Sequence, residues 1–342
     1  MALAYLAWEQ IFLEERVLII GRRLERRILR DGQNPFELPN GTSLQHKRTS
    51  GLSPELQVLV CLHFYAQGSY QKGLGGNSIL NISQPSVSRC IHYVTEAINQ
   101  CLLRKWIKFP MTSAERQRAR ETFAHAPQSF EGTIGAIDCT YIHILAPRQH
   151  EEAYVNHHGK HSLNVQAIVN SKLQCVVEWS TYHYNNGERQ TWLIGDAGYP
   201  LEPWLMTPLP HYPEGTRHFE YTKKICKARN VVERFFGVLK SMWRCLSYQR
   251  VLMYSPDMAG KIVNACATLH NIRIHCNLPT LEDFDIIDQE NNQDELLENQ
   301  PEPEFDPALI GNERGPRAIA QRIQKQLMLE QFGNYRDGNN DQ

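Results

Sequence analysis

The chain has 342 residues, of which 42% are hydrophobic and 9% aromatic, so it can bury the core of one large domain or two smaller ones. This composition excludes wholesale disorder, and no apolar run reaches the roughly 18 residues that a membrane-spanning helix needs. The sequence starts without a secretion signal, and its nine cysteines include no CxxC pair. We therefore expect an intracellular protein with reduced thiols and no membrane association.

Charge is distributed unevenly along the chain. The formal net charge is −1, but eleven acidic residues and no Lys or Arg lie between residues 281 and 306. Without that segment the rest of the chain carries a charge of about +10. A basic body favours a polyanion such as DNA, because each phosphate that it neutralises releases counterions. The same distribution would also suit a solvated linker on an ordinary intracellular protein.

The first part of the chain is helical in pattern. Residues 1–50 contain an apolar helical stretch, arginine pairs and then a linker rich in Pro, Gly, Asn and Ser. Within residues 51–110 we predict three helices, the first capped by Ser53, a short one near 78–80, and a third capped by Ser83. This order is typical of a helix-turn-helix, although any three-helix subdomain would share it.

The periodicity changes to that of β-strands at residue 133. A helix follows at residues 230–244, which predicts a mixed sheet flanked by helices in an α/β (α+β) domain spanning 111–276. The remainder, 277–342, is acidic and poor in aromatic residues, so we expect it to be mostly disordered with one terminal helix in PRAIAQRIQKQLMLEQF. The four strand-like runs are TIGAIDCTYIHIL, SLNVQAIVN, LQCVVEWSTY and WLIGDAGYP.

Three acidic residues lie at positions where a carboxylate could act as a metal ligand or a catalytic group. Asp138 interrupts an apolar strand, Asp196 precedes a glycine turn, and Glu233 lies beside the buried stripe of a helix. Singly, each has an ordinary explanation: a strand-end or Arg-paired aspartate, an Asx turn and a solvated helix charge. Together, separated by 58 and 37 positions, they predict a polynucleotidyl-transfer site of the ribonuclease H-like kind. There, carboxylates hold two Mg²⁺ ions about 3.5–4 Å apart.

Several motifs, in the same order, resemble the PIF/Harbinger transposase family and the nucleases derived from it. The DDE domain of that family is matched by GAIDCTYIHI, YVNHHGKHSLNVQAIV, LIGDAGYPLEPWLMTPL, NVVERFFGVLKSMWRCL and ACATLHNI. Its helix-turn-helix part is matched by SPELQVLVCLHFYAQGSYQ and NISQPSVSRCIHYVTEAI. The resemblance covers about residues 51–276 and implies a ribonuclease H-like fold preceded by an all-helical part.

The resemblance also implies a function and its site. It implies a metal-dependent DNA endonuclease whose catalytic and metal-binding residues are Asp138, Asp196 and Glu233, with Mg²⁺ or Mn²⁺ as the cation. It further implies a nuclear, and also cytoplasmic, location and a Myb-like partner protein that helps to recruit DNA. We expect DNA contacts from the helix that begins near residue 84 and from the basic run before Glu233, where solvated charges are the ordinary alternative. These contacts would come from Gln84, Ser86, Ser88, Arg89, Lys223, Lys224, Lys227 and Arg229.

One departure from the family pattern leaves the activity open. Between Ser180 and Trp192 the chain lacks a segment resembling PGSxHDSxIF and the helix after it, so one sheet-covering helix is expected to be missing. A chain that lost catalysis with that segment would be a DNA-binding or scaffold protein. A third alternative is a protein-interaction module that works through the acidic tail.

Overall fold

The computed structural model describes residues 52–68, 82–176, 190–210, 212–278 and 315–335. The chain divides into two compact units, each built from three separate stretches of sequence. The first comprises residues 1–108, 140–165 and 236–284, and the second comprises 109–139, 166–235 and 285–342. We describe each unit by itself.

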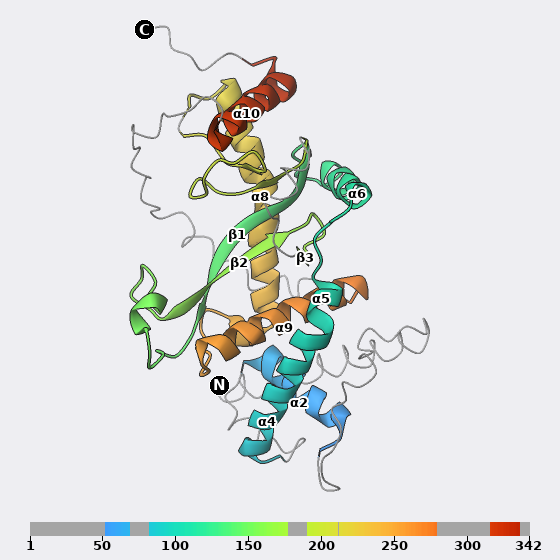
Figure 1. The fold of residues 1–342 in the computed structure, drawn as a ribbon, viewed down its shortest axis with the longest axis vertical. Coiled ribbons are helices and arrows are strands. Elements are labelled where there is room, and N and C mark those ends of the chain that lie inside the picture. The colour runs from blue at the N-terminus through green and yellow to red at the C-terminus, as the bar shows by residue number, and fades with distance from the viewer. Residues whose placement is uncertain (1–51, 69–81, 177–189, 211, 279–314, 336–342) are drawn as a thin grey trace, which may run out of the picture. The chain divides into compact units, whose positions relative to one another are not determined.

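The first unit contains the N-terminal helices α2 (Pro54–Gln67) and α4 (Gln84–Ala97) (Figure 1). Helix α2 begins as predicted, because the Ser53 hydroxyl accepts a hydrogen bond from the amide of Leu56. It ends at Gly68, whose φ of 60° and close approach to the Arg244 carbonyl leave no room for a side chain. Both predicted helices are therefore confirmed, the first with its Ser53 cap; Ser83 stands at the N-cap position of α4, but its side chain makes no capping hydrogen bond to the backbone.

Helix α4 carries the apolar stripe that its sequence predicts. The helix continues through a π-helical turn (Ile98–Leu102) and a short helix, α5 (Leu103–Trp106). The hydroxyls of Tyr65 and Thr95 share a buried 2.6 Å hydrogen bond between α2 and α4. Asn99 donates to the carbonyl of Lys261 in α9 (Pro256–His275), a helix buried along most of its length. The buried stripe consists of Val87, Ile91, Val94, Ile98 and Leu102.

A five-stranded mixed sheet follows the order β3-β2-β1-β4-β5. Strand β4 pairs in parallel with both β1 and β5, whereas β2 and β3 are antiparallel. This mixed sheet with flanking helices confirms the predicted ribonuclease H-like α/β fold. The strands are β1 (Thr133–His143), β2 (Ser162–Val169), β3 (Cys175–Val176), β4 (Trp192–Ile194) and β5 (Leu205–Met206).

The core of the second unit lies against both faces of β1. Residues 133–137 are all buried, without the alternation that a strand with one solvated face would show. Helix α6 (Ser113–Ala124), which begins with a complete capping box, packs Ala119 against this core. The central cluster consists of Phe109, Ile134, Ile137, Ile168, Leu193 and Leu205.

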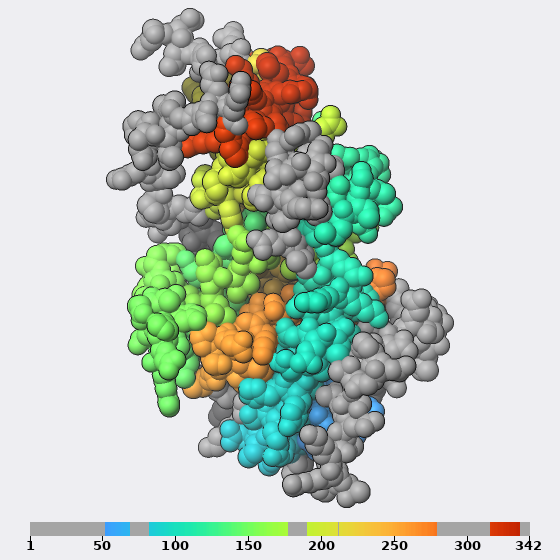
Figure 2. Space-filling view, viewed as in Figure 1, coloured from blue at the N-terminus to red at the C-terminus, as the bar shows by residue number. Residues whose placement is uncertain are grey.

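Two long helices complete the second unit. Helix α8 (Arg217–Met242) starts well before the predicted residue 230, because the Thr216 hydroxyl accepts from the amide of Phe219 and caps a basic first half. The C-terminal helix α10 (Pro316–Phe332) is confirmed at the predicted residues. Its red atoms in Figure 2 lie directly against yellow atoms of the chain that precedes and begins α8.

A buried glutamine anchors α10, and its removal is expected to destabilise the second unit. Gln324 donates to the carbonyl of Thr207 at 3.0 Å and to the hydroxyl of Tyr221 at 3.1 Å, both in buried surroundings. Gln324→Ala should lower the free energy of unfolding by about 1–3 kcal/mol, because two buried polar groups lose a partner. The control Gln326→Ala, on the exposed side of α10, should change it by less than about 0.5 kcal/mol in the same urea titration. Equal effects would contradict this anchoring role.

Some predictions fall on residues that the structure does not describe. These are the segment 1–50, the short helix near 78–80, the acidic stretch 281–306, and most of the interval in which a sheet-covering helix is expected to be missing. Within the described ranges, no helix combines the length and apolar character needed to cross a membrane.

Candidate active site

Asp138 lies in the middle of β1 with its side chain 18% exposed. One carboxylate oxygen accepts from the amide of Cys139 at 2.7 Å, and the other accepts from Nη1 of Arg229 at 2.7 Å. Burial raises the pKa of Asp138 above its usual value, the Arg229 charge opposes that rise, and the charges of Asp196 and Glu233 add to it. Asp196 and Glu233 therefore both lie near enough to Asp138 for their charges to act on it.

The sheet register explains why Asp138 and Asp196 converge. Ala136 of β1 pairs with Ile194 of the parallel strand β4, and each aspartate follows its paired residue by two positions. Asp138 therefore lies within β1 and Asp196 in the turn just after β4, each two residues beyond the last paired position of these neighbouring strands. The Asp196 carboxylate accepts from the amide of Gly198 at 3.0 Å, which holds the turn after β4.

Helix α8 supplies the third acid and a cation. Glu233 follows Arg229 by one helical turn, and its carboxylate accepts from Nη2 of Arg229 at 2.6 Å. The Arg229 side chain is 19% exposed and that of Glu233 is 37% exposed. One guanidinium thus joins the carboxylates of Asp138 and Glu233, which lie on different elements of the second unit.

The three carboxylates suit a hard divalent cation in their chemistry, since Mg²⁺ and Mn²⁺ prefer oxygen ligands. Among the described residues, however, no three His, Cys, Asp or Glu side chains are arranged to hold one metal ion together. Instead, Asp138 and Glu233 both form an ion pair with the same cation, the guanidinium of Arg229. The donor set fits the predicted metals in its chemistry, with the Arg229 guanidinium on one oxygen of Asp138 and one oxygen of Glu233.

A polar group beside the acids was not predicted. The Tyr199 hydroxyl lies 3.2 Å from Sγ of Cys139 and accepts from Nε2 of Gln166 at 3.0 Å. Its ring fits because Gly195 has no side chain, since a Cβ there would lie 3.1 Å from the ring. The signal in the sequence was the GDAGYP turn, which places a tyrosine three residues after Asp196.

The predicted DNA contacts on α8 have different surroundings. Lys223 pairs with Glu220 at 3.7 Å and lies over the Phe219 ring. Lys224 donates to the side chain of Gln331 in α10 at 3.2 Å, and Lys227 is exposed. Arg229 lies against the acids. Of the four, Lys223 and Lys227 are exposed, whereas Lys224 and Arg229 are half-buried.

The predicted contacts on α4, in the first unit, lie in its first two turns. Gln84 and Arg89 are exposed, whereas Ser86 and Ser88 are half-buried. Arg89 donates to the hydroxyl of Ser86 at 3.0 Å, and that hydroxyl also lies 3.0 Å from the Ser83 hydroxyl. The polar tip of this helix therefore presents one cation together with hydroxyl groups.

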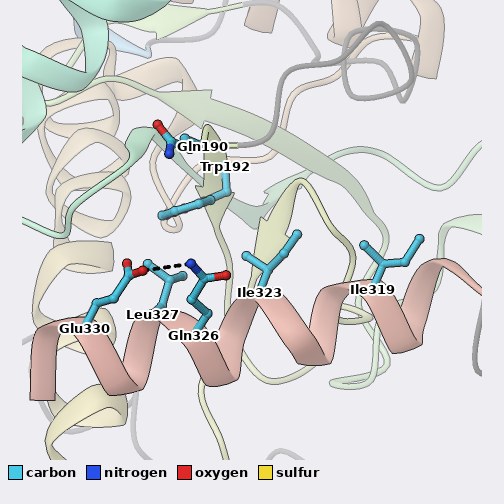
Figure 3. Close-up of a pocket in the computed structure, with 7 residues that line it drawn as sticks. All are labelled: Gln190, Trp192, Ile319, Ile323, Gln326, Leu327 and Glu330. Atoms are coloured by element: carbon cyan, nitrogen blue, oxygen red, sulfur yellow. Dashed lines mark hydrogen bonds between the residues drawn. The ribbon is translucent and has the colours of Figure 1, made fainter. Parts of the chain in front are cut away.

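A cavity of about 450 Å³ in the second unit lies apart from the acids. Figure 3 shows its wall, in which side chains project from α10 toward Trp192 and Gln190 at the start of β4. Gln326 and Glu330 bond to each other along its rim at 2.8 Å. None of the three acids lines this cavity, which is bounded by Gln190, Trp192, Ile319, Ile323, Gln326, Leu327 and Glu330.

Comparison with known proteins decides the family. The sequence profile of the DDE superfamily endonucleases matches residues 137–271. The human protein named "Putative nuclease HARBI1" is 31% identical over 305 residues, which cover 84% of this chain and 82% of the human protein. The chain belongs to the HARBI1 family of DDE superfamily endonucleases. The predicted resemblance to Harbinger-derived nucleases is therefore confirmed.

Other members of the HARBI1 family and more distant proteins match as well. The bovine protein of the same name is 34% identical over 255 residues, 68% of this chain and 72% of the bovine one. Protein ALP1-like from Arabidopsis thaliana is 26% identical over 267 residues, 68% of this chain and 63% of that protein. No solved structure matches the chain. Membership in the HARBI1 family makes this a nuclease-type protein whose family suggests nucleic acid as the substrate.

Proposed function

We propose that the protein is a metal-dependent DNA endonuclease that hydrolyses phosphodiester bonds by a two-metal mechanism. The observation that carries the proposal is that Asp138 and Asp196 each lie two residues beyond the last paired position of the parallel strands β1 and β4, with Glu233 linked to Asp138 through Arg229. Burial lowers the local dielectric constant, so carboxylates gathered there attract a divalent cation more strongly than exposed ones. The described residues offer oxygen ligands of the kind that Mg²⁺ and Mn²⁺ prefer.

In this proposal Asp138, Asp196 and Glu233 hold the cations, and the sheet fixes two of the three ligands. When bound, the divalent ions would activate the attacking water or 3′-hydroxyl and stabilise the oxygen that leaves the phosphorus. Because Asp138 lies in β1 and Asp196 directly follows the paired strand β4, the sheet would hold these two ligands close to each other. Glu233, on helix α8, would supply the third carboxylate ligand.

DNA would be bound by both basic elements. In the first unit, Gln84, Ser86, Ser88 and Arg89 would contact DNA from the start of α4. In the second unit, Lys223, Lys224, Lys227 and Arg229 would contact phosphates near the acids, and Lys223 and Lys227 are the two that are exposed. The proposal includes a Myb-like partner protein that helps to recruit DNA and a nuclear, also cytoplasmic, location.

A plasmid-nicking assay on the full chain tests this function. Supercoiled DNA is incubated with the protein in Mg²⁺, in Mn²⁺ and in excess chelator, and duplex binding is measured in parallel over a salt series. We expect nicking in either cation, none in chelator, and binding that weakens steeply with salt. A chain that binds duplex DNA but nicks it under no condition contradicts the proposal and indicates a catalytically inactive DNA-binding or scaffold protein.

A further inference from the structure

The Arg229 guanidinium has an unusual set of contacts. Its two terminal nitrogens bond to two different carboxylates, Asp138 at 2.7 Å and Glu233 at 2.6 Å, instead of gripping one carboxylate with both. Its third nitrogen, Nε, is buried and has no hydrogen-bond partner among the described residues. The side chain therefore links β1 to α8 through two hydrogen bonds while its third nitrogen stays unsatisfied. The contacts favour bridging two acids over satisfying every donor of the guanidinium.

Charge explains why a cation is needed there when no metal is bound. Asp138, Asp196 and Glu233 bring three negative charges together, and Asp196 and Glu233 each act on Asp138. An arginine keeps its charge throughout the physiological pH range, so it neutralises part of this charge permanently. Arg229 occupies one oxygen of each carboxylate, and a divalent cation held by the same two groups would repel the guanidinium charge beside it, so the two cations compete for this position.

We infer that Arg229 is an internal counterion, which holds Asp138 and Glu233 together in the metal-free protein and is displaced from them when a divalent cation binds. The inference rests on the proposed function, because it assigns metal to the same carboxylates. The inference also assigns the guanidinium a second role after its displacement. Once released, it stays beside the acids on α8 and can contact a phosphate of the bound nucleic acid.

Calorimetric titration of the full chain with Mn²⁺ alone tests displacement without any substrate. Arg229→Gln removes the competing cation, so it should bind Mn²⁺ roughly ten- to a hundredfold more tightly than the wild type. Arg229→Lys keeps the charge but cannot span two carboxylates, so the affinity of this variant for Mn²⁺ should lie between that of the wild type and that of Arg229→Gln. The matched control is Arg234→Gln, which removes an exposed arginine next to Glu233 on the same helix and should change the affinity less than threefold.

Thermal unfolding gives a second, independent reading of the same coupling. In chelator, Arg229→Gln should unfold several degrees below the wild type, because two carboxylates lose their counterion. In saturating Mn²⁺ the difference should shrink to a degree or less, since the metal then supplies the charge. A difference of the same size with and without Mn²⁺ would mean a purely structural ion pair and overturns the inference.

The outcomes separate the inference from the proposed function. If the wild type binds Mn²⁺ through Asp138 but Arg229→Gln binds no more tightly, or Arg234→Gln gains as much, the displacement inference is overturned alone. If Arg229→Gln binds more tightly but no variant nicks DNA, the inference stands and the endonuclease proposal fails. A wild-type chain that binds no Mn²⁺ overturns both.

Discussion

Asp138→Asn is expected to reduce Mg²⁺-dependent nicking of plasmid DNA at least about a hundredfold while changing duplex binding less than twofold. Removing residues that merely support a metal ligand typically costs 10–100-fold, and Asp138 is itself a ligand in the proposed site. The amide keeps the shape of the side chain but loses the charge that a divalent cation needs. The measurement is the initial nicking rate at fixed protein and DNA, with binding followed by fluorescence anisotropy.

The variant should fold. Burial raises the pKa of Asp138, so the folded protein disfavours its charged form, and a neutral isostere of the same size is tolerated. The control is Glu131→Gln, an exposed acid that lies just before β1, which should nick at the wild-type rate. Retained nicking by Asp138→Asn, with thermal unfolding like that of the wild type, would refute its role as a metal ligand.

The sequence predicted the acids but not the link between them. A period of two identified Asp138 as an unusual strand residue, and the glycine turn marked Asp196. Their adjacency depends on the pairing of Ala136 with Ile194, and no local pattern specifies which strands become neighbours. Parallel pairing between strands more than fifty residues apart is a property of the whole fold.

Arg229 shows how a correct residue can have an unforeseen partner. A run of lysines and arginines before Glu233 predicted phosphate contacts. The spacing of four residues between Arg229 and Glu233 is visible in the sequence and is a known helix pair. Its second partner, Asp138, is 91 residues away, so only the packing of α8 on β1 reveals that the guanidinium joins two acids.

Some features of the helices could be predicted from local sequence signals, whereas others could not. Ser53 and the apolar stripe of α4 predicted helix starts and faces, because caps and periodicity are local properties. The first half of α8 was missed, since the basic stretch from Arg217 has little apolar periodicity of its own. That half nevertheless buries Tyr221 and Ile225, and the Tyr221 hydroxyl accepts a hydrogen bond from Gln324 of α10, a contact that no local pattern indicates.

The sheet core beneath the acids supports the second large prediction. Leu193 is 1% exposed and lies in β4 between β1 and β5, packed in the cluster with Ile134 and Leu205. Leu193→Ala should lower the free energy of unfolding by about 2–5 kcal/mol, because it removes buried methyl groups and leaves a cavity in a strand with neighbours on both sides. The change is measured as the shift of the urea midpoint for the full chain.

The matched control for Leu193→Ala is Leu329→Ala, which makes the same chemical change on the outer side of α10, where the leucine is 50% exposed. Its cost should stay below about 0.5 kcal/mol, since little apolar surface is lost from the interior. Because β4 carries Asp196 at its end, a cavity at Leu193 should also weaken Mn²⁺ binding at temperatures where the variant remains folded. If the two leucines cost the same, β4 is not a buried inner strand between β1 and β5, and the sheet does not support Asp196 in the way proposed.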